Sequence, residues 1–311
     1  MVLSMLPKAK GAKGMFWRPL GLVAFVVFLA LPSIPRAAVP VPDVVVTVTP
    51  LHGLASALMQ GVATPYLLIR GNLSPHTYAL KPSGAARIER ADIVFMIGPE
   101  LETSLVAPIA NLGGGARIVA LGQGARKAFG ETDNPDPHVW LDPLMAAQMV
   151  SDMEEVLETA DPAHAATYRE NAARLQTRLN DLNRRIAQRL APVSGVPFIT
   201  FHEAYTYFEN RYHLAGKGSI ALSEQQRPGA RHVRELQRMI GTQGIACVFA
   251  EPQFSDALVD LLVEGSGARK AVLDPLGADL APGPDMYFEL MDGLADTFYV
   301  CLSDDSVPTD T

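Results

Sequence analysis

The chain has 311 residues and carries 26 lysines and arginines against 33 aspartates and glutamates, which gives a formal net charge of -7 at pH 7. An acidic chain does not present the basic surface that phosphate backbones require, so we expect no nucleic acid among its partners. The length suffices for a short leader followed by two domains, each with a buried core.

The first residues have the pattern of an export signal. A run of apolar residues at 20–31 follows a basic lead-in that contains no acidic residue. About a dozen apolar residues suit the core of a signal peptide and fall short of the ~20 that span a bilayer. We therefore predict that residues 1–38 are a signal peptide, removed near Ala37, and that the mature protein is periplasmic. An uncleaved N-terminal anchor is the alternative interpretation.

The chain has two cysteines, Cys247 and Cys301. Neither lies just after the apolar run, where a lipid-modified cysteine would be. We therefore expect a soluble mature protein without a lipid on an N-terminal cysteine. In an oxidising compartment two cysteines are more often a disulfide than two free thiols, and a bond across this loop would add about 4 kcal/mol to the free energy of unfolding. A pair of thiolate metal ligands is the alternative, although no histidine or further cysteine lies beside either residue at ligand spacing.

Short apolar runs predict the β-strands. The runs are continuous rather than alternating, which indicates strands covered on both faces, as in the parallel sheets of α/β proteins. They lie at residues 44–48, 66–69, 93–97, 118–121, 197–201, 247–250 and 271–273. A stretch from 143 to 190 without a strand candidate separates the first four runs from the last three, so we predict two sheets.

The middle stretch is typical of helix. Asp142 and Asp161 each precede a proline, which predicts an N-cap followed by the first helical position. In the second helix, apolar residues recur every three or four positions and arginines occupy much of the opposite face. The apolar positions are Tyr168, Ala172, Leu175, Leu179, Leu182, Ile186 and Leu190. Such a helix is ~40 Å long, enough to link two small domains.

The predicted fold class is therefore α/β, with two lobes that are each a parallel sheet flanked by helices and that are joined by one long rigid linker helix. We place the N-terminal lobe at 39–160, the linker helix at 161–192 and the C-terminal lobe at 193–311. Neither an internal repeat nor a low-complexity segment interrupts this division.

Position singles out three of the seven histidines. In open α/β sheets, ligands bind beyond the carboxyl ends of the strands, so a polar residue just after a strand is placed for function. His202 directly follows a predicted strand, as Asp274 does, and His76 and His138 lie in loops that follow two others. Each predicted lobe contributes two of these residues, so all four can converge between the lobes.

Three neutral imidazoles and a carboxylate are a ligand set for Zn²⁺ and largely exclude Ca²⁺ and Mg²⁺, which prefer oxygen ligands. Mn²⁺ and Fe²⁺ stay open, because selectivity among these metals depends on a geometry that a sequence does not show. A structural interpretation also stays open for each residue. A loop histidine is commonly solvated, and Asp274 before Pro275 fits a turn or a helix cap.

The local sequences around the four candidates resemble the ligand segments of one family. These segments are 74–83 (SPHTYALKPS), 136–143 (DPHVWLDP), 201–205 (FHEAY) and 273–277 (LDPLG). In this order they are similar to those of the ZnuA-like proteins, the cluster A-I solute-binding proteins that serve metal ABC importers. The resemblance covers nearly the whole mature chain, and 136–143 is its most specific string.

The resemblance implies two α/β lobes joined by one long helix, with a metal ion held between them by His76, His138, His202 and Asp274. A histidine at position 202 is similar to the zinc-binding members, whereas a glutamate there is associated with manganese-binding ones. The four residues chosen because they follow predicted strands are thus the same four that the resemblance implies as ligands.

Two further features bear on the resemblance. Cys247 and Cys301 look like the disulfide pair of some zinc-type members. The segment at 122–136 is short and contains no histidine, where many zinc-type members carry a long loop rich in histidine and acidic residues. The segment at 122–136 therefore does not indicate zinc specificity. Within the resemblance, zinc is favoured by the histidine at position 202.

We predict high-affinity capture of a transition-metal ion, zinc in the first instance, in the periplasm and its delivery to the membrane permease of an ABC importer, by a monomer without enzymatic activity. A periplasmic metal donor is a further candidate partner. The alternatives are a Mn²⁺ or Fe²⁺ carrier, a zinc metallohydrolase with Glu203 as its general base, and a metal-binding adhesin. Because imidazoles bind metal only when neutral, we expect the affinity to weaken as the pH falls through ~6.5.

The other histidines have structural interpretations. His164, His213 and His232 lie on predicted helices or at their ends, which favours surface or capping roles. His52 lies in a segment that resembles a family loop near the metal, and we expect it outside the ligand set.

Overall fold

The computed structural model describes residue 14 and residues 40–130, 136–221 and 228–303. The chain divides into two compact units, Met1–Ala38 and Val39–Thr311, and the fold is that of the second unit. The predicted signal peptide lies outside the described residues, apart from Gly14. In the described part of the chain, no helix is both long enough and apolar enough to cross a membrane.

The first sheet contains four parallel strands in the order β2-β1-β3-β4. Its strands are β1 (Val44–Val46), β2 (Tyr66–Leu67), β3 (Ile93–Met96) and β4 (Arg117–Ala120). The helices between them and after them are α1 (Thr49–Leu58), α2 (Pro82–Arg90), α3 (Val106–Leu112) and α4 (Leu121–Ala128). All residues of β1 and β3 are buried, because both faces of these interior strands are covered.

The second sheet repeats this arrangement with four parallel strands in the order β6-β5-β7-β8. Its strands are β5 (Pro197–His202), β6 (Ala215–Ala221), β7 (Cys247–Ala250) and β8 (Arg269–Val272). Its helices are α7 (Thr206–Tyr212), α8 (Ala230–Gln243), α9 (Ala257–Val263) and α10 (Met286–Leu302). The predicted α/β class with two parallel sheets is confirmed. We call the part built on the first sheet the N-terminal half and the part built on the second sheet the C-terminal half.

Strand β6 was not predicted from the sequence. This strand reads AGKGSIA, so its first four positions contain two glycines and a lysine instead of an apolar run. It lies at an edge of its sheet, where one side of the backbone is unpaired and continuous burial is not required. The pattern of a doubly covered strand therefore does not apply to it.

Two long helices, α5 (Pro143–Ala160) and α6 (Ala165–Leu190), occupy the stretch where no strand was predicted. The N-cap at Asp142 is confirmed, since its carboxylate accepts a hydrogen bond from the backbone N–H of Leu144 at 2.8 Å. The N-cap predicted at Asp161 is wrong, because this residue is the C-cap of α5 and the next helix starts only at Ala165, with His164 before it. The Asp161 carboxylate instead accepts hydrogen bonds from the Tyr168 hydroxyl and from His164 Nδ1.

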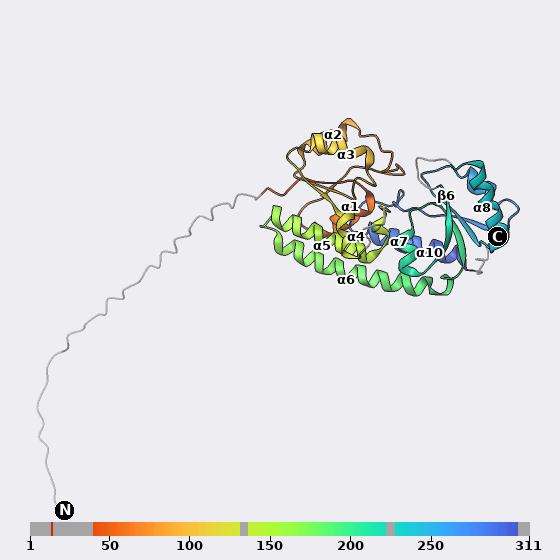
Figure 1. Cartoon of the computed structure of the whole chain (residues 1–311). Helices are drawn as coiled ribbons and strands as arrows, with labels where there is room; N and C mark the ends of the chain where they lie inside the picture. Colours follow the sequence, from red (N-terminus) through yellow and green to blue (C-terminus); the bar gives the residue numbers. More distant parts are fainter. Residues whose placement is uncertain (1–13, 15–39, 131–135, 222–227, 304–311) are drawn as a thin grey trace, which may run out of the picture. The chain divides into compact units, whose positions relative to one another are not determined.

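Helix α6 contacts both halves (Figure 1). Near its start, the buried Asn171 donates from Nδ2 to the carbonyls of Leu58 and Gln60 at the end of α1. Further along, three arginines pair with aspartates at the start of α10 and along it, each 107 positions later: Arg178–Asp285, Arg185–Asp292 and Arg189–Asp296. The constant offset shows that α6 and α10 run in the same direction. Exposed pairs of this kind are individually weak, so the apolar stripe of α6 supplies most of the attachment.

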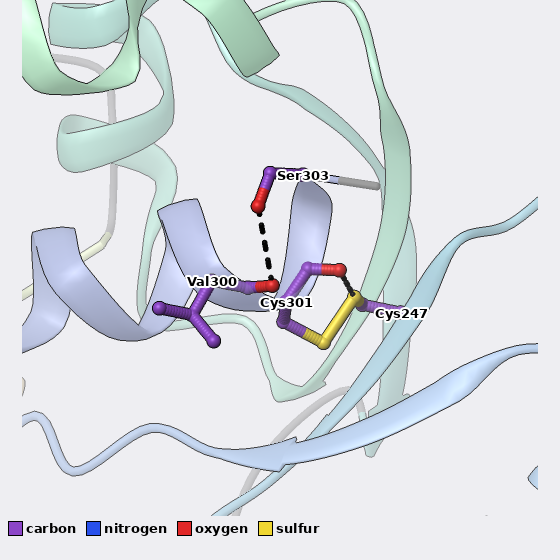
Figure 2. Close-up of a disulfide and its surroundings, with 4 residues drawn as sticks. All are labelled: Cys247, Val300, Cys301 and Ser303. Carbon is purple, nitrogen blue, oxygen red and sulfur yellow. Dashed lines mark hydrogen bonds between the residues drawn. A yellow bond between two sulfur atoms is a disulfide. The ribbon is translucent and has the colours of Figure 1, made fainter. Parts of the chain in front are cut away.

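A disulfide joins Cys247, the first residue of β7, to Cys301 near the end of α10 (Figure 2). The disulfide expected from the compartment and from the family resemblance is therefore confirmed, and the alternative of two thiolate ligands is wrong. The bond ties the last helix to an interior strand of the second sheet.

Removal of this disulfide should lower stability without unfolding the protein. The double variant Cys247→Ser/Cys301→Ser should lose about 4 kcal/mol of unfolding free energy in urea titrations, because the 54-residue loop between the two positions is no longer closed in the unfolded chain. A reductant should lower the stability of the wild-type chain by the same amount and leave that of the variant unchanged. Equal unfolding free energies of the disulfide-bonded wild type and the double variant, both measured without reductant, would contradict this role of the disulfide.

Candidate metal centre

Three imidazoles converge on one point. The Nε2 atom of His138 lies 3.4 Å from Nε2 of His76 and 3.4 Å from Nε2 of His202. One ligand atom from each ring lies within 4.8 Å of the other two. Among the residues that the structure describes, no other set of three or more His, Cys, Asp or Glu side chains meets this limit. All three of these histidines were predicted from the sequence, and the structure brings them together.

The spacing of these nitrogens fits a tetrahedral metal ion. Two nitrogens that each lie ~2.05 Å from one tetrahedral Zn²⁺ are ~3.3 Å apart. The two Nε2 separations of 3.4 Å are close to this value. Imidazole nitrogens are also donors that zinc prefers over oxygen-seeking cations. The three residues present therefore fit a zinc ion.

Carboxylates hold the far nitrogens of two of these rings. Asp136 Oδ1 lies 2.7 Å from Nδ1 of His138, and Glu251 Oε1 lies 2.8 Å from Nδ1 of His202. A carboxylate accepts, so each Nδ1 donates its proton and Nε2 of the neutral ring keeps its lone pair. The backbone N–H of His138 also donates to Asp136, at 2.9 Å. Both rings thus present lone pairs to the same point, which is the arrangement that binds a cation.

The local fold explains how these side chains reach the site. His202 is the last residue of β5, an interior strand of the second sheet, and Glu251 follows the neighbouring strand β7. His138 precedes the short 3₁₀ helix η2 (Val139–Leu141), after which Asp142 caps the N-terminus of α5. In parallel sheets the carboxyl ends of neighbouring strands lie at one edge, so His202 and its carboxylate partner are side by side.

His76 differs from the other two imidazoles. It is only half-buried and lies in the loop between β2 and α2, where its backbone N–H donates to the Ser74 hydroxyl at 3.2 Å. Burial, and to a smaller extent the nearby rings of His138 and His202, together lower the pKa of His76 to about 3, although the charge of Asp136 acts in the opposite direction. His76 is therefore neutral at physiological pH, so a metal ion does not have to displace a proton from it.

The surroundings of the cluster are acidic. Burial, together with the negative charges of Asp136 and Glu203, raises the pKa of Glu209, on α7, to about 7. Burial also raises the pKa of the Tyr205 hydroxyl, with the charges of Glu251 and Asp274 contributing. Carboxyl groups close enough to disfavour one another's ionisation create a negative potential, which attracts a cation.

Asp274 is not part of the cluster of three. Its Oδ1 accepts hydrogen bonds from the backbone N–H of Leu276 at 3.0 Å and from Gln253 Nε2 at 3.2 Å, and its Oδ2 accepts one from the backbone N–H of Ala278 at 2.5 Å. The carboxylate thus shapes the turn that follows β8, which is the structural interpretation that the sequence left open. The negative charge of Asp274 nevertheless contributes, as that of Glu251 does, to the raised pKa of the Tyr205 hydroxyl. Asp274 therefore lies near the site.

The remaining candidates lie outside the cluster. His52 is buried on α1, where its Nε2 donates to the carbonyl of Pro65 at 3.1 Å. His164 precedes α6 and binds Asp161, and His232 on α8 donates to the carbonyl of Ser219 at 2.9 Å. Glu203, the base considered for a hydrolase, is exposed.

The two carboxylates that accept hydrogen bonds from these rings were not predicted from the sequence. Glu251 directly follows a predicted strand, so the rule that found His202 and Asp274 also applied to it. Asp136 lies two positions before His138, in the most specific string of the chain. Both signals were present, but neither says which side chain contacts which nitrogen.

Comparisons with known proteins point to one family. Residues 44–301 match the family model described as "ZnuA: Zinc-uptake complex component A periplasmic". A protein of Brucella suis biovar 1 (strain 1330), "High-affinity zinc uptake system protein ZnuA", is 40% identical over 84% of this chain and 91% of its own length. One of the same name from Yersinia pestis is 28% identical over 92% of this chain and 98% of its own. A solved structure, "Crystal structure of ZnuA", has a TM-score of 0.75 at 26% identity and covers 85% of this chain and 100% of that one.

Acidification should destabilise the metal-free protein through His76. Below about pH 6.5 an unfolded histidine binds a proton, whereas His76 in the folded chain stays neutral down to about pH 3. The unfolded state therefore binds more protons in this window. The unfolding free energy decreases as the pH is lowered, by up to ~1.4 kcal/mol per pH unit. Urea titrations of the metal-free protein between about pH 7 and pH 5 should show a shallower decline for His76→Gln than for the wild type. Parallel declines would disprove the assignment.

Substitution of Glu251 should weaken zinc binding in graded steps. Glu251→Gln keeps an acceptor for His202 Nδ1 and should cost ~10-fold in affinity, whereas Glu251→Ala removes it and should cost up to ~100-fold. Competition with a chromophoric chelator measures both. Glu102→Gln is the matched control, because this buried carboxylate binds Thr47, Ile97 and Gly98 and no imidazole. Equal losses in the control and in Glu251→Gln would argue against a specific role.

Proposed function

The chain belongs to the ZnuA family of periplasmic zinc-uptake components, whose model matches residues 44–301, and from this premise we propose that it captures Zn²⁺ with high affinity in the periplasm and delivers it to the permease of an ABC importer. The observation that supports this most directly is the convergence of the Nε2 atoms of His76, His138 and His202. Two of these rings are oriented in advance by carboxylates, so little ordering is needed when the ion binds.

The proposed ligands are the three imidazoles and Asp274. An ionised carboxylate offers about four lone-pair sites, and the Asp274 carboxylate uses three of them for Leu276, Ala278 and Gln253. The site left on Oδ2 is free to bind a cation, and a metal ion in the cluster supplies the attraction. In this proposal Asp274 turns a set of three donors into a closed tetrahedral site.

Release of the ion follows from where the ligands lie along the chain. His76 and His138 belong to the N-terminal half and His202 and Asp274 to the C-terminal half, so any separation of the halves divides the ligand set. Bonds between the halves resist this, including Arg211 of α7 with the Asp142 carboxylate at 2.8 and 2.5 Å. We propose that the permease supplies the work of opening, with lobes at 39–160 and 193–311 moving about the helix at 161–192.

The remaining parts of the proposal concern location and partners. The apolar run and basic lead-in of residues 1–38 support removal as a signal peptide, and the absence of a cysteine before Cys247 supports a mature protein without a lipid anchor. We propose a monomer that receives zinc in the periplasm, with a metal donor protein as a candidate source. We assign it no catalytic step, because the family model describes a zinc-uptake component and the side chain of Glu203 is exposed.

Zinc binding should depend on the cluster and not on histidine content. His138→Ala should lower the zinc affinity more than ~100-fold, because it removes the imidazole whose Nε2 lies next to those of both other histidines. This loss exceeds the ~10–100-fold typical of groups that only support a ligand. His164→Ala, the matched control, removes a ring that binds Asp161 and should keep one tightly bound zinc. Chelator competition measures both, and a parallel titration with Mn²⁺ shows which metal is preferred.

Two outcomes would contradict the proposal. Retention of tight zinc binding by His138→Ala would place the ion elsewhere. A wild-type preference for Mn²⁺ over Zn²⁺ at equal free concentrations would make the protein a manganese carrier.

A further inference from the structure

Trp140 links the loop of one proposed ligand to the loop of another. It lies in η2, two positions after His138, and its side chain is fully buried. The rings of Trp140 and His138 meet edge to face with centroids 5.2 Å apart. The indole Nε1 donates to the carbonyl of Pro275 at 2.8 Å, across 135 positions of the chain. Pro275 directly follows Asp274, so this bond joins the two halves beside the metal cluster.

A second bond fixes Trp140 itself. Its carbonyl accepts a hydrogen bond from the hydroxyl of Tyr287, the second residue of α10, at 2.6 Å. Tyr287 is also fully buried. The tryptophan is therefore held at its backbone by α10 and reaches with its indole to the turn after β8. A buried indole N–H without an acceptor is costly, so this contact resists breakage.

The Asp274 carboxylate moves with its own turn. Two of its three hydrogen bonds come from the backbone of the same turn, at Leu276 and Ala278. The side-chain rotamer of Asp274 is thus fixed within the turn. The distance from its carboxylate to the imidazoles therefore depends on the contacts that hold the turn against the segment of His138. The bond from Trp140 to Pro275 is such a fixing contact, and it acts one residue away from Asp274.

We propose that Trp140 is a positioning residue that holds the turn of Asp274 against the imidazole cluster, so that this carboxylate and not water completes the coordination of the metal. This inference rests on the proposed function. A closed tetrahedral site favours Zn²⁺, whereas Mn²⁺ prefers six oxygen-rich ligands, so a fixed carboxylate also restricts the choice of metal. Without the indole N–H the turn moves away, water enters, and the site becomes more open.

Binding of Co²⁺ as the probe tests this role. Tetrahedral Co²⁺ has stronger visible absorption bands than five- or six-coordinate Co²⁺, so the spectrum reports how the site is completed. Trp140→Phe keeps an aromatic ring and removes the N–H. Its Co²⁺ spectrum should match that of Asp274→Ala in losing intensity, and its zinc affinity should fall ~10-fold. In the double variant, Trp140→Phe should add no further change, because it acts through Asp274.

Two controls separate position from stability. Tyr168→Phe also removes one buried hydrogen bond, from its hydroxyl to Asp161, and should keep the wild-type spectrum. If Trp140→Phe does not fold, replacement of the indole by benzothiophene keeps the two-ring shape without the N–H and should give the same spectral change.

The remaining outcomes are distinct. A wild-type spectrum in Trp140→Phe, or a further change when it is added to Asp274→Ala, would overturn the inference. A wild-type spectrum in Asp274→Ala would also overturn it, while leaving zinc capture by the three imidazoles intact. Failure of the wild-type protein to bind Zn²⁺ or Co²⁺ would instead refute the proposed function.

Discussion

Two N–H···O bonds to carboxylates decide where the lone pairs of His138 and His202 point. With Asp136 and Glu251 accepting from Nδ1, each neutral ring has its unprotonated nitrogen at Nε2, and the two Nε2 atoms lie 3.4 Å apart. Facing lone pairs at this separation repel one another until a cation lies between them. The two carboxylates also bring two negative charges into the interior, which one divalent cation balances. Geometry and charge therefore both favour occupation by a metal ion.

The rest of the fold keeps these groups in place. Strands β5 and β7 end side by side, so His202 and Glu251 meet without any adjustment of the backbone. The segment of His138 belongs to the other half, and residues of the C-terminal half hold it from several directions. Tyr207 donates to the carbonyl of Asp136, Arg211 binds Asp142, and Tyr287 donates to the carbonyl of Trp140. The site is thus built across two sheets, which allows tight binding and also release when the halves separate.

The sequence was sufficient for the features that depend on local pattern. Doubly covered strands give continuous apolar runs, so β1, β3, β5 and β7 were predicted, and the three histidines followed from their place at strand ends and in one motif. The edge strand β6, with Gly216 and Gly218, has no such pattern and was missed. Pairings between distant residues were also beyond prediction. Glu251 and His202 are 49 positions apart and Trp140 and Pro275 are 135 apart, and only side-chain directions in the folded chain decide that they meet.

The most direct test of the central claim is a crystal structure of the zinc-loaded protein with anomalous diffraction measured on both sides of the zinc absorption edge. We expect a single strong peak ~2.0–2.1 Å from Nε2 of His76, His138 and His202. A peak that contacts fewer than two of these rings, or that lies at their Nδ1 atoms in place of Asp136 and Glu251, would contradict it.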